Sequence, residues 1–307
     1  MCCLFGLIDY RHSLSTRQKT HILSVLAASC EARGTDATGI AYHSKGRLRI
    51  YKRPVPAHLL RLSLPEDANV VMGHTRMTTQ GDARKNFNNH PFCGSSDIGP
   101  FALAHNGVIY NDDLLRGPHK LKIPKIETDS FVAVQLLEQK RILNFSSLRY
   151  MAEQVEGSFT FTILDARDNL YIIKGDNPMC LYHYPKLGIY LYASTQEILN
   201  QALAHLALPW EQPRQIRINC GEILRIDSSG IITRDKFDDS KLFRHRYSMY
   251  WWPFYSAGAS RNSSNDHLEE IKSVASAFGY TPEEIDNLAV EGFTPEELED
   301  FLYCGEL

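Results

Sequence analysis

The chain opens with the stretch MCCLFGLI, residues 1–8, which places a cysteine directly after the initiator methionine. Methionine ahead of a small side chain is normally removed, so we expect Cys2 to become the first residue, with a free α-amino group beside its thiol. A thiol has an ordinary pKa of about 8.5 and an α-amino group one of about 7.7 to 8.0, so the amine can take the thiol proton. Such a residue is an N-terminal nucleophile. The alternative is that Cys2 is a small apolar residue that opens a buried strand.

The bulk properties are those of an ordinary globular protein. The 307 residues are 43% hydrophobic and 22% charged, enough for one large domain or two smaller ones. The sequence shows neither an apolar run of about 20 residues nor a secretory signal, so we expect a cytoplasmic protein that does not contact membranes. The seven cysteines form no C-x-x-C pair, so we expect reduced thiols and no metal site.

Charge is distributed unevenly along the chain. Residues 265–307 contain one basic and twelve acidic residues, whereas residues 1–264 contain 32 basic and 24 acidic residues. The basic residues are spread out rather than clustered with aromatic residues. This pattern favours a solvated surface over a nucleic-acid interface.

Short strand-like runs dominate the first 240 residues, and helical patterns lie between blocks of them, which predicts an α+β layered domain rather than a regular βαβ alternation. The helical patterns cover residues 15–34, with Ser15 or Thr16 as N-cap and Gly34 as the stop, and residues 127–141 and 145–155. The expected strands are residues 3–9, 37–43, 48–54, 69–75, 101–107, 158–166, 169–175, 179–184, 188–195 and 221–233, the last with a hairpin turn at DSSG.

The character of the sequence changes after about residue 243. Residues 244–265 pass from an aromatic cluster to a linker-like composition, and residues 266–307 form an acidic tail with two near-copies, GYTPEEIDNL and GFTPEELEDF. Each copy has the Thr, Pro and Glu of a capping box, so each predicts a short helix, one from Thr281 and one from Thr294. We expect a small helical appendage that aids solubility, forms a homo-oligomer or docks a partner.

Three further stretches carry residues suited to amide chemistry. Arg76 in GHTRMTTQG follows apolar strand residues and projects from a strand end, where its planar fork can grip a carboxylate. Asn106 and Gly107 in LAHNGVIYN can offer a side-chain amide and a backbone N–H to an oxyanion, although Asn-Gly is also a hairpin-turn signal. Asp129 in IETDSFV is expected in the first turn of a helix, where a carboxylate is also favoured by the helix dipole alone.

Taken together, these stretches resemble the glutaminase domain of the class II glutamine amidotransferases, whose nucleophile is an N-terminal cysteine. The resemblance covers about residues 2 to 240 and rests on five motifs in the family's order. They are CCLFG at residues 2–6, RGTDATG at 33–39, GHTRMTT at 73–79, HNG at 105–107 and ETDS at 127–130.

The resemblance implies a fold and a set of binding residues. Residues 2–243 would form the four-layer αββα sandwich of the N-terminal-nucleophile hydrolases. Arg76 would hold the α-carboxylate of glutamine with Thr79 beside it, and Asp129 would hold the α-ammonium. His105 of the HNG motif would belong to the same binding site.

The resemblance also implies a reaction. Cys2 would attack the side-chain amide, with Asn106 and the Gly107 N–H as oxyanion hole. Ammonia would leave, and water would hydrolyse the γ-glutamyl thioester. No cofactor is implied.

Two positions depart from the family pattern. The family usually has an aromatic residue where Met77 stands and a glycine where Cys3 stands, and the Cys3 thiol is expected to crowd the backbone near the nucleophile. About sixty residues follow residue 243, too few for an ammonia-accepting domain, and no glycine-rich phosphate loop is present. We therefore expect glutamine or a γ-glutamyl compound as substrate and a separate synthase subunit as partner. The alternatives are cleavage of another amide by the same mechanism, and a non-catalytic module that senses glutamine.

Overall fold

The computed structural model describes residues 2–206 and 212–242 and, nearer the C terminus, 268, 271, 272, 275, 280–291, 293 and 298. The chain forms two compact units, Met1–Tyr247 and Ser248–Leu307. The expected aromatic segment and linker, residues 244–265, lie outside the described residues. The three-part division of the chain stays a prediction.

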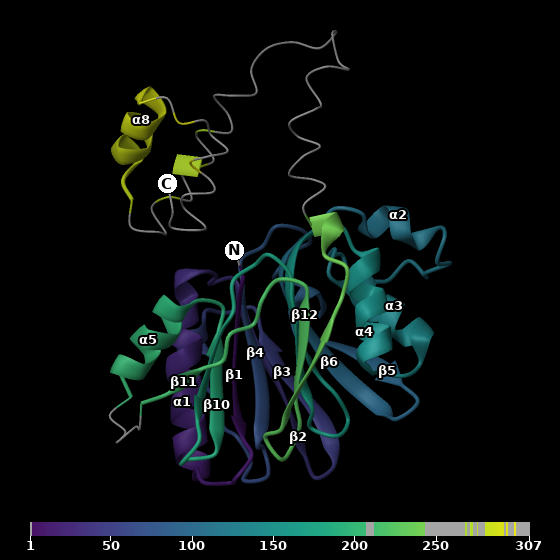
Figure 1. Cartoon of the computed structure of the whole chain (residues 1–307), viewed down its shortest axis with the longest axis vertical. Helices are drawn as coiled ribbons and strands as arrows, with labels where there is room; N and C mark the ends of the chain where they lie inside the picture. Colours follow the sequence, from purple (N-terminus) through teal and green to yellow (C-terminus); the bar gives the residue numbers. More distant parts are fainter. Residues whose placement is uncertain are drawn as a thin grey trace. The chain divides into compact units, whose positions relative to one another are not determined.

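The first unit is built on two antiparallel sheets (Figure 1). The seven-stranded sheet has the order β11-β9-β10-β1-β4-β2-β3, and the six-stranded sheet has the order β13-β12-β8-β7-β6-β5. The strands are β1 (Cys3–Asp9), β2 (Ala37–Ser44), β3 (Arg47–Arg53), β4 (Val70–Arg76), β5 (Phe92–Ser96), β6 (Gly99–Ile109), β7 (Gly157–Leu164), β8 (Leu170–Lys174), β9 (Cys180–Tyr184), β10 (Ile189–Ala193), β11 (Arg214–Gln215), β12 (Glu222–Ile226) and β13 (Ile232–Lys236).

Helices cover the outer face of each sheet. Helices α1 (Thr16–Ser29) and α5 (Gln196–Ala204) pack on the seven-stranded sheet, and α3 (Phe131–Lys140) and α4 (Phe145–Gln154) pack on the six-stranded one. The short elements are α2 (Asp112–Arg116) and the 3₁₀ turns η1 (Cys30–Ala32), η2 (Ala57–Leu59) and η3 (Asn86–Asn88). The predicted four-layer αββα sandwich is confirmed.

Strand β1 lies in the centre of its sheet and is buried along its whole length. Cys3, Phe5 and Leu7 face the helical layer, whereas Leu4 and Ile8 face the other sheet. A strand covered on both faces is apolar on both faces. This explains the continuous apolar run that opens the sequence.

Two local expectations differ from the structure. Helix α1 begins as predicted, with Ser15 as N-cap and a capping box to Gln18, but it ends at Ser29 and continues into η1 rather than running to Gly34. Asn106 and Gly107 do not form a hairpin turn, because both are paired with β7 inside β6.

The second unit contains helix α8 (Pro282–Val290). Its N-cap is Thr281, which forms the predicted capping box with Glu284, and Ile285 is buried in a small apolar cluster. The second predicted helix start, Thr294, lies outside the described residues.

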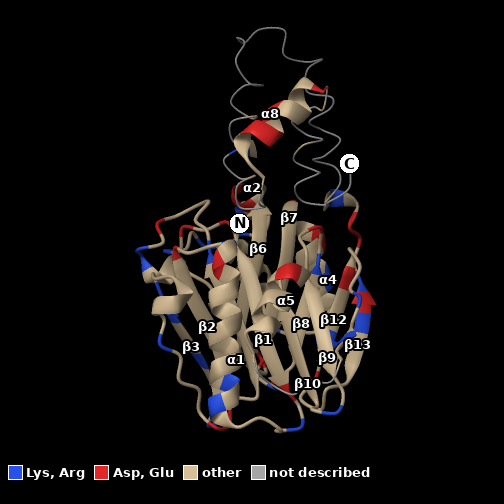
Figure 2. Ribbon diagram, turned by 90° about the vertical axis from the view of Figure 1, so that its left-hand side faces the viewer, with Lys and Arg blue, Asp and Glu red and all other residues tan. Residues whose placement is uncertain are grey.

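Charged residues of the first unit lie mainly on loops and on the edge strands β3 and β13, whereas the central strands are almost free of them (Figure 2). None of the described helices is long and apolar enough to cross a membrane.

The interior position of Gly6 gives a test of the packing. A Cβ atom there would lie 2.4 Å from the Val71 carbonyl oxygen and 2.5 Å from Tyr192 Cε1. We expect Gly6→Ala to lower the free energy of unfolding by about 1–3 kcal/mol or more, since overpacking a tight core strains it. Urea denaturation measures the change.

Gly117→Ala is the matched control, because no atom lies within 4 Å of its added Cβ and its φ is −63°. Equal stability of the two variants would contradict this account of the β1 environment.

Candidate active site

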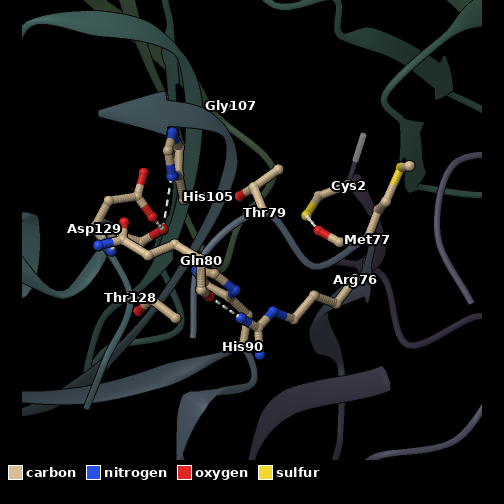
Figure 3. A pocket seen from close by; sticks show the side chains of 11 residues that line it. Cys2, Arg76, Met77, Thr79, Gln80, His90, His105, Gly107, Thr128 and Asp129 are labelled. Atoms are coloured by element: carbon tan, nitrogen blue, oxygen red, sulfur yellow. Dashed lines mark hydrogen bonds between the residues drawn. The ribbon is translucent and has the colours of Figure 1, made fainter. Parts of the chain in front are cut away.

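A pocket lies where β1 begins and β4 ends. Because Cys3 pairs with Thr75 in antiparallel register, the residue before Cys3 lies beside the residue after Thr75, and Cys2 is thereby brought to Arg76. Figure 3 shows the Arg76 side chain extending from the side of Cys2 toward Gln80 and Asp129. The pocket is lined by Cys2, Arg76, Met77, Thr79, Gln80, His90, His105, Gly107, Thr128, Asp129 and Ser130.

Cys2 is half-buried, and its thiol donates to the Met77 carbonyl oxygen at 3.5 Å. Its own carbonyl oxygen accepts from Arg33 Nε at 3.1 Å, which fixes the main chain at the start of β1. Burial raises the pKa of the Cys2 thiol, and the positive charge of Arg76 opposes this shift. The thiol is therefore mainly protonated near neutral pH and requires a base to become a nucleophile.

Cys3, which stands where the family has a glycine, is not among the residues that line the pocket. It is fully buried on the helical face of β1, where its Sγ lies 2.8 Å from the Sγ of Cys30. The alternation of side chains along a strand places Cys2 and Cys3 on opposite faces.

Arg76 is buried, and its guanidinium is held by two acceptors. Nη1 donates to Asn89 Oδ1 at 2.7 Å, and Nη2 donates to the Gln80 carbonyl oxygen at 2.5 Å. A guanidinium carries five N–H donors in one plane. These two bonds fix the plane and leave three donors for other acceptors.

Asp129 provides the opposite charge. Its Oδ2 accepts from the Ile109 N–H at 2.6 Å, and its own N–H donates to Gln80 Oε1 at 3.1 Å. Gln80 thus contacts both Arg76 and Asp129. The expectation that Asp129 lies in the first turn of a helix is wrong by two residues, because α3 begins at Phe131 with Ser130 as its N-cap residue.

His105 is linked to Asp129 through the hydroxyl of Ser130. Its Nδ1 lies 2.8 Å from Ser130 Oγ, and Ser130 Oγ donates to Asp129 Oδ1 at 3.2 Å. The His105 carbonyl oxygen accepts from His74 Nε2 at 3.0 Å. Burial lowers the pKa of His74 to about 3 and also lowers that of His105, so both rings are neutral near pH 7.

The two predicted oxyanion-hole residues are placed differently. Gly107 lines the pocket with a φ of +139°, and a Cβ there would lie 1.9 Å from the Ser158 carbonyl oxygen, so the position requires glycine. Asn106 is fully buried and is not among the lining residues; its Nδ2 lies 3.5 Å from Ser194 Oγ. Among the described residues, nothing bonds to Asn106 Oδ1.

Several lining residues are not among those predicted from the sequence. Gln80 follows Arg76 by four residues in the same motif, and Ser130 follows Asp129, so both were within reach of a motif-based argument. Thr128 directly precedes Asp129 in the ETDS motif and was equally within reach, whereas His90 carried no such signal. Within the described part of the chain, no group of three or more His, Cys, Asp or Glu residues is arranged to hold a metal ion.

Residues 74–201 match the family model described as a glutamine amidotransferase domain. The chain contains a glutamine amidotransferase domain that is homologous to the class II domains. The domain is 34% identical over 157 residues to a glutamine–fructose-6-phosphate aminotransferase (isomerizing) of Bacillus anthracis, a match that covers 48% of this chain and 26% of that protein. It is 32% identical over 190 residues to the enzyme of the same name from Staphylococcus aureus strain N315, covering 59% and 30%. The chain thus spans less than a third of these relatives.

Solved structures agree with the fold of the amidotransferase domain. The glutamine phosphoribosylpyrophosphate amidotransferase of B. subtilis superimposes with a TM-score of 0.60 at 19% identity, over 77% of this chain and 49% of that one. A structure described as the allosteric regulatory enzyme of purine biosynthesis gives a TM-score of 0.62, also at 19% identity, over the same shares of the two chains. At this identity the similarity concerns the fold alone.

The Cys2 pKa gives a test of the pocket's electrostatics. We expect the rate of alkylation of Cys2 by iodoacetamide to rise with pH through a midpoint above that of free cysteine, because burial disfavours the thiolate. Arg76→Met should move the midpoint higher still, since it removes a positive charge that stabilises the thiolate. Peptide mass spectrometry after timed alkylation measures the rate at Cys2 separately from the other cysteines. A lower midpoint in Arg76→Met would contradict the proximity of the two groups.

Proposed function

We propose that this chain hydrolyses the side-chain amide of glutamine, or of a γ-glutamyl compound, through a thioester on Cys2. The observation that supports the proposal most strongly is that one pocket contains a thiol, a fixed guanidinium and a fixed carboxylate. A free α-amino acid carries one charge of each sign, so it requires one partner of each sign. Arg76 would bind the α-carboxylate through its unused donors, and Asp129 would bind the α-ammonium.

The attack on the amide requires a proton acceptor close to Cys2. Among the residues lining the pocket, His90 and His105 are buried with lowered pKa values, and Asp129 is held by hydrogen bonds. The α-amino group of Cys2 itself, freed by removal of Met1, is the base that we propose. It takes the thiol proton, sulfur bonds to the amide carbon, and the carbonyl oxygen becomes an oxyanion.

The oxyanion requires donors, which we propose are the Gly107 N–H and the Asn106 side-chain amide. Losing one such donor typically costs about 2.7–4 kcal/mol of barrier. Asn106 would have to turn its amide from Ser194 toward the pocket. The proton on the α-amino group then passes to the leaving nitrogen, ammonia departs, and water cleaves the thioester to give the γ-carboxylate and free thiol.

The partner and the compartment are further proposals. The ammonia would serve a synthase subunit on another chain, and the acidic tail, residues 266–307, would bind that partner or a second copy. We expect the protein to act in the cytoplasm.

The intact mass of the purified protein tests the nucleophile directly. We expect a mass lacking Met1 and, after treatment with a glutamine-like chloroketone, one adduct located on Cys2. Retention of Met1 in active protein would rule out the α-amino base. An adduct that forms equally well on Cys93, which is exposed, would show reactivity without recognition of the glutamyl group.

Cys2→Ala should abolish ammonia release from glutamine while leaving the melting temperature unchanged, because the thiol supplies the attacking atom. Cys2→Ser should retain little activity, since a hydroxyl is far less acidic. Cys93→Ala is the control and should match the wild type. If Cys3→Ala were inactive and Cys2→Ala active, the nucleophile would be misassigned.

Arg76→Lys should lower kcat/KM for glutamine by roughly 10- to 100-fold, the equivalent of a lost charged hydrogen bond of about 1.5–3 kcal/mol. An ammonium cannot supply two parallel bonds to a carboxylate. Steady-state ammonia release measures the effect, with Arg47→Lys, an exposed position on β3, as control. If the enzyme hydrolysed a simple acyl amide as fast as glutamine, its substrate would be another class of amide. If it bound glutamine without hydrolysing it, the chain would be a non-catalytic module that senses glutamine.

A further inference from the structure

Lys52 on β3 lies outside the pocket but is bonded to the segment that borders it. Its Nζ donates to the carbonyl oxygens of Asn89 and Pro91, the latter at 3.0 Å, and lies 5.1 Å from the centre of the Phe92 ring. Its own carbonyl oxygen accepts from Asn86 Nδ2 at 2.9 Å. Both the main chain and the side chain of Lys52 therefore hold residues 86–92.

The same segment holds the substrate-binding guanidinium. Asn89 accepts from Arg76 through Oδ1, and its Nδ2 donates to the Ala83 carbonyl oxygen at 2.8 Å. The next residue, His90, lines the pocket. The segment can approach β2 closely because the residue opposite Lys52 is Gly39, where a Cβ would lie 2.2 Å from the His90 carbonyl oxygen.

Asn89 connects two cations through two different oxygens. The main-chain oxygen accepts from Lys52, and the side-chain oxygen accepts from Arg76. Burial lowers the pKa of Lys52 to about 8, with the Arg76 charge contributing, so the ammonium is mostly protonated near pH 7. A partly buried ammonium is retained when it is hydrogen-bonded, and its bonds to neutral acceptors are strong because the donor is charged.

We infer that Lys52 is a positioning residue for the carboxylate site, which holds Arg76 in place through Asn89. The inference rests on the proposed function, because it assigns the role of that same arginine. Lys52 does not touch the substrate. Its loss would let the Asn89–Pro91 segment shift, and with it the acceptor that fixes the plane of the guanidinium.

The role predicts a particular kinetic pattern. The substrate's α-carboxylate takes no part in the bond changes, so it is bound equally in the ground state and the transition state. Weakening the arginine–carboxylate interaction therefore raises KM more than it lowers kcat. A defect in folding alone would lower the amount of active enzyme, and hence the apparent kcat, at unchanged KM.

The experiment compares Lys52→Met, Lys52→Arg and Arg49→Met in the full chain, with ammonia release from glutamine as readout. We expect Lys52→Met to lower kcat/KM by about 10- to 100-fold, chiefly through KM, as for a small displacement of a binding group. Lys52→Arg, which keeps a charged donor, should recover most of the loss. Arg49→Met removes an exposed cation from the same strand and should behave as the wild type.

A wild-type KM in Lys52→Met would overturn the inference, whether or not kcat falls. If the wild type itself released no ammonia, the proposed function would fail. The inference would then be decided by crystal structures of the wild type and Lys52→Met. Loss of the Arg76–Asn89 bond in the variant supports it, and an unchanged bond overturns it.

Discussion

The antiparallel pairing of β1 with β4 is the constraint on which the rest of the site depends. It sets Cys2, the proposed nucleophile, beside Arg76, because Cys2 precedes the beginning of one central strand and Arg76 ends its neighbour. Both strands are buried on two faces, so a register shift by one residue would exchange the residues facing the helices with those facing the second sheet. The position of Cys2 is therefore fixed by the same apolar contacts that hold the sandwich together.

The buried charges of the pocket are each neutralised by dipoles rather than by direct ion pairing. Arg76 bonds to an amide oxygen and a carbonyl oxygen, and Asp129 accepts from a backbone N–H and a hydroxyl. Gln80 contacts both groups and keeps them at a fixed spacing. In the proposed function, such an arrangement would leave both charges available to a zwitterionic substrate with little reorganisation on binding. His90 and His105 also line the pocket, and because burial lowers their pKa values they carry no charge near pH 7.

Sequence reasoning reached the parts of the structure that are governed by local patterns. The apolar run of β1, the capping box at Ser15 and the strand end at Arg76 all follow from short-range chemistry. The α+β layering was predicted from the order of strand and helix patterns. The αββα arrangement, which is confirmed, and the assignment of the pocket residues to one site followed from a resemblance of motifs. The roles of the pocket residues stay predictions.

What the sequence did not reveal depends on tertiary contacts. His90 belongs to none of the motifs and lines the pocket only through the tertiary fold, and the orientation of Asn106 depends on Ser194, 88 residues away. Lys52 looked like one of several basic residues on an edge strand. Its partners are carbonyl oxygens, which every residue possesses and no sequence pattern marks.

The main chain and the side chain of Met77 lie in different environments. Its carbonyl oxygen meets the Cys2 thiol, while its side chain is 48% exposed at the pocket's edge. Because the inward contact is made by the main chain, a different side chain at this position would still offer the Cys2 thiol the same acceptor. The absence of the family's aromatic residue therefore does not remove the hydrogen bond that the thiol donates.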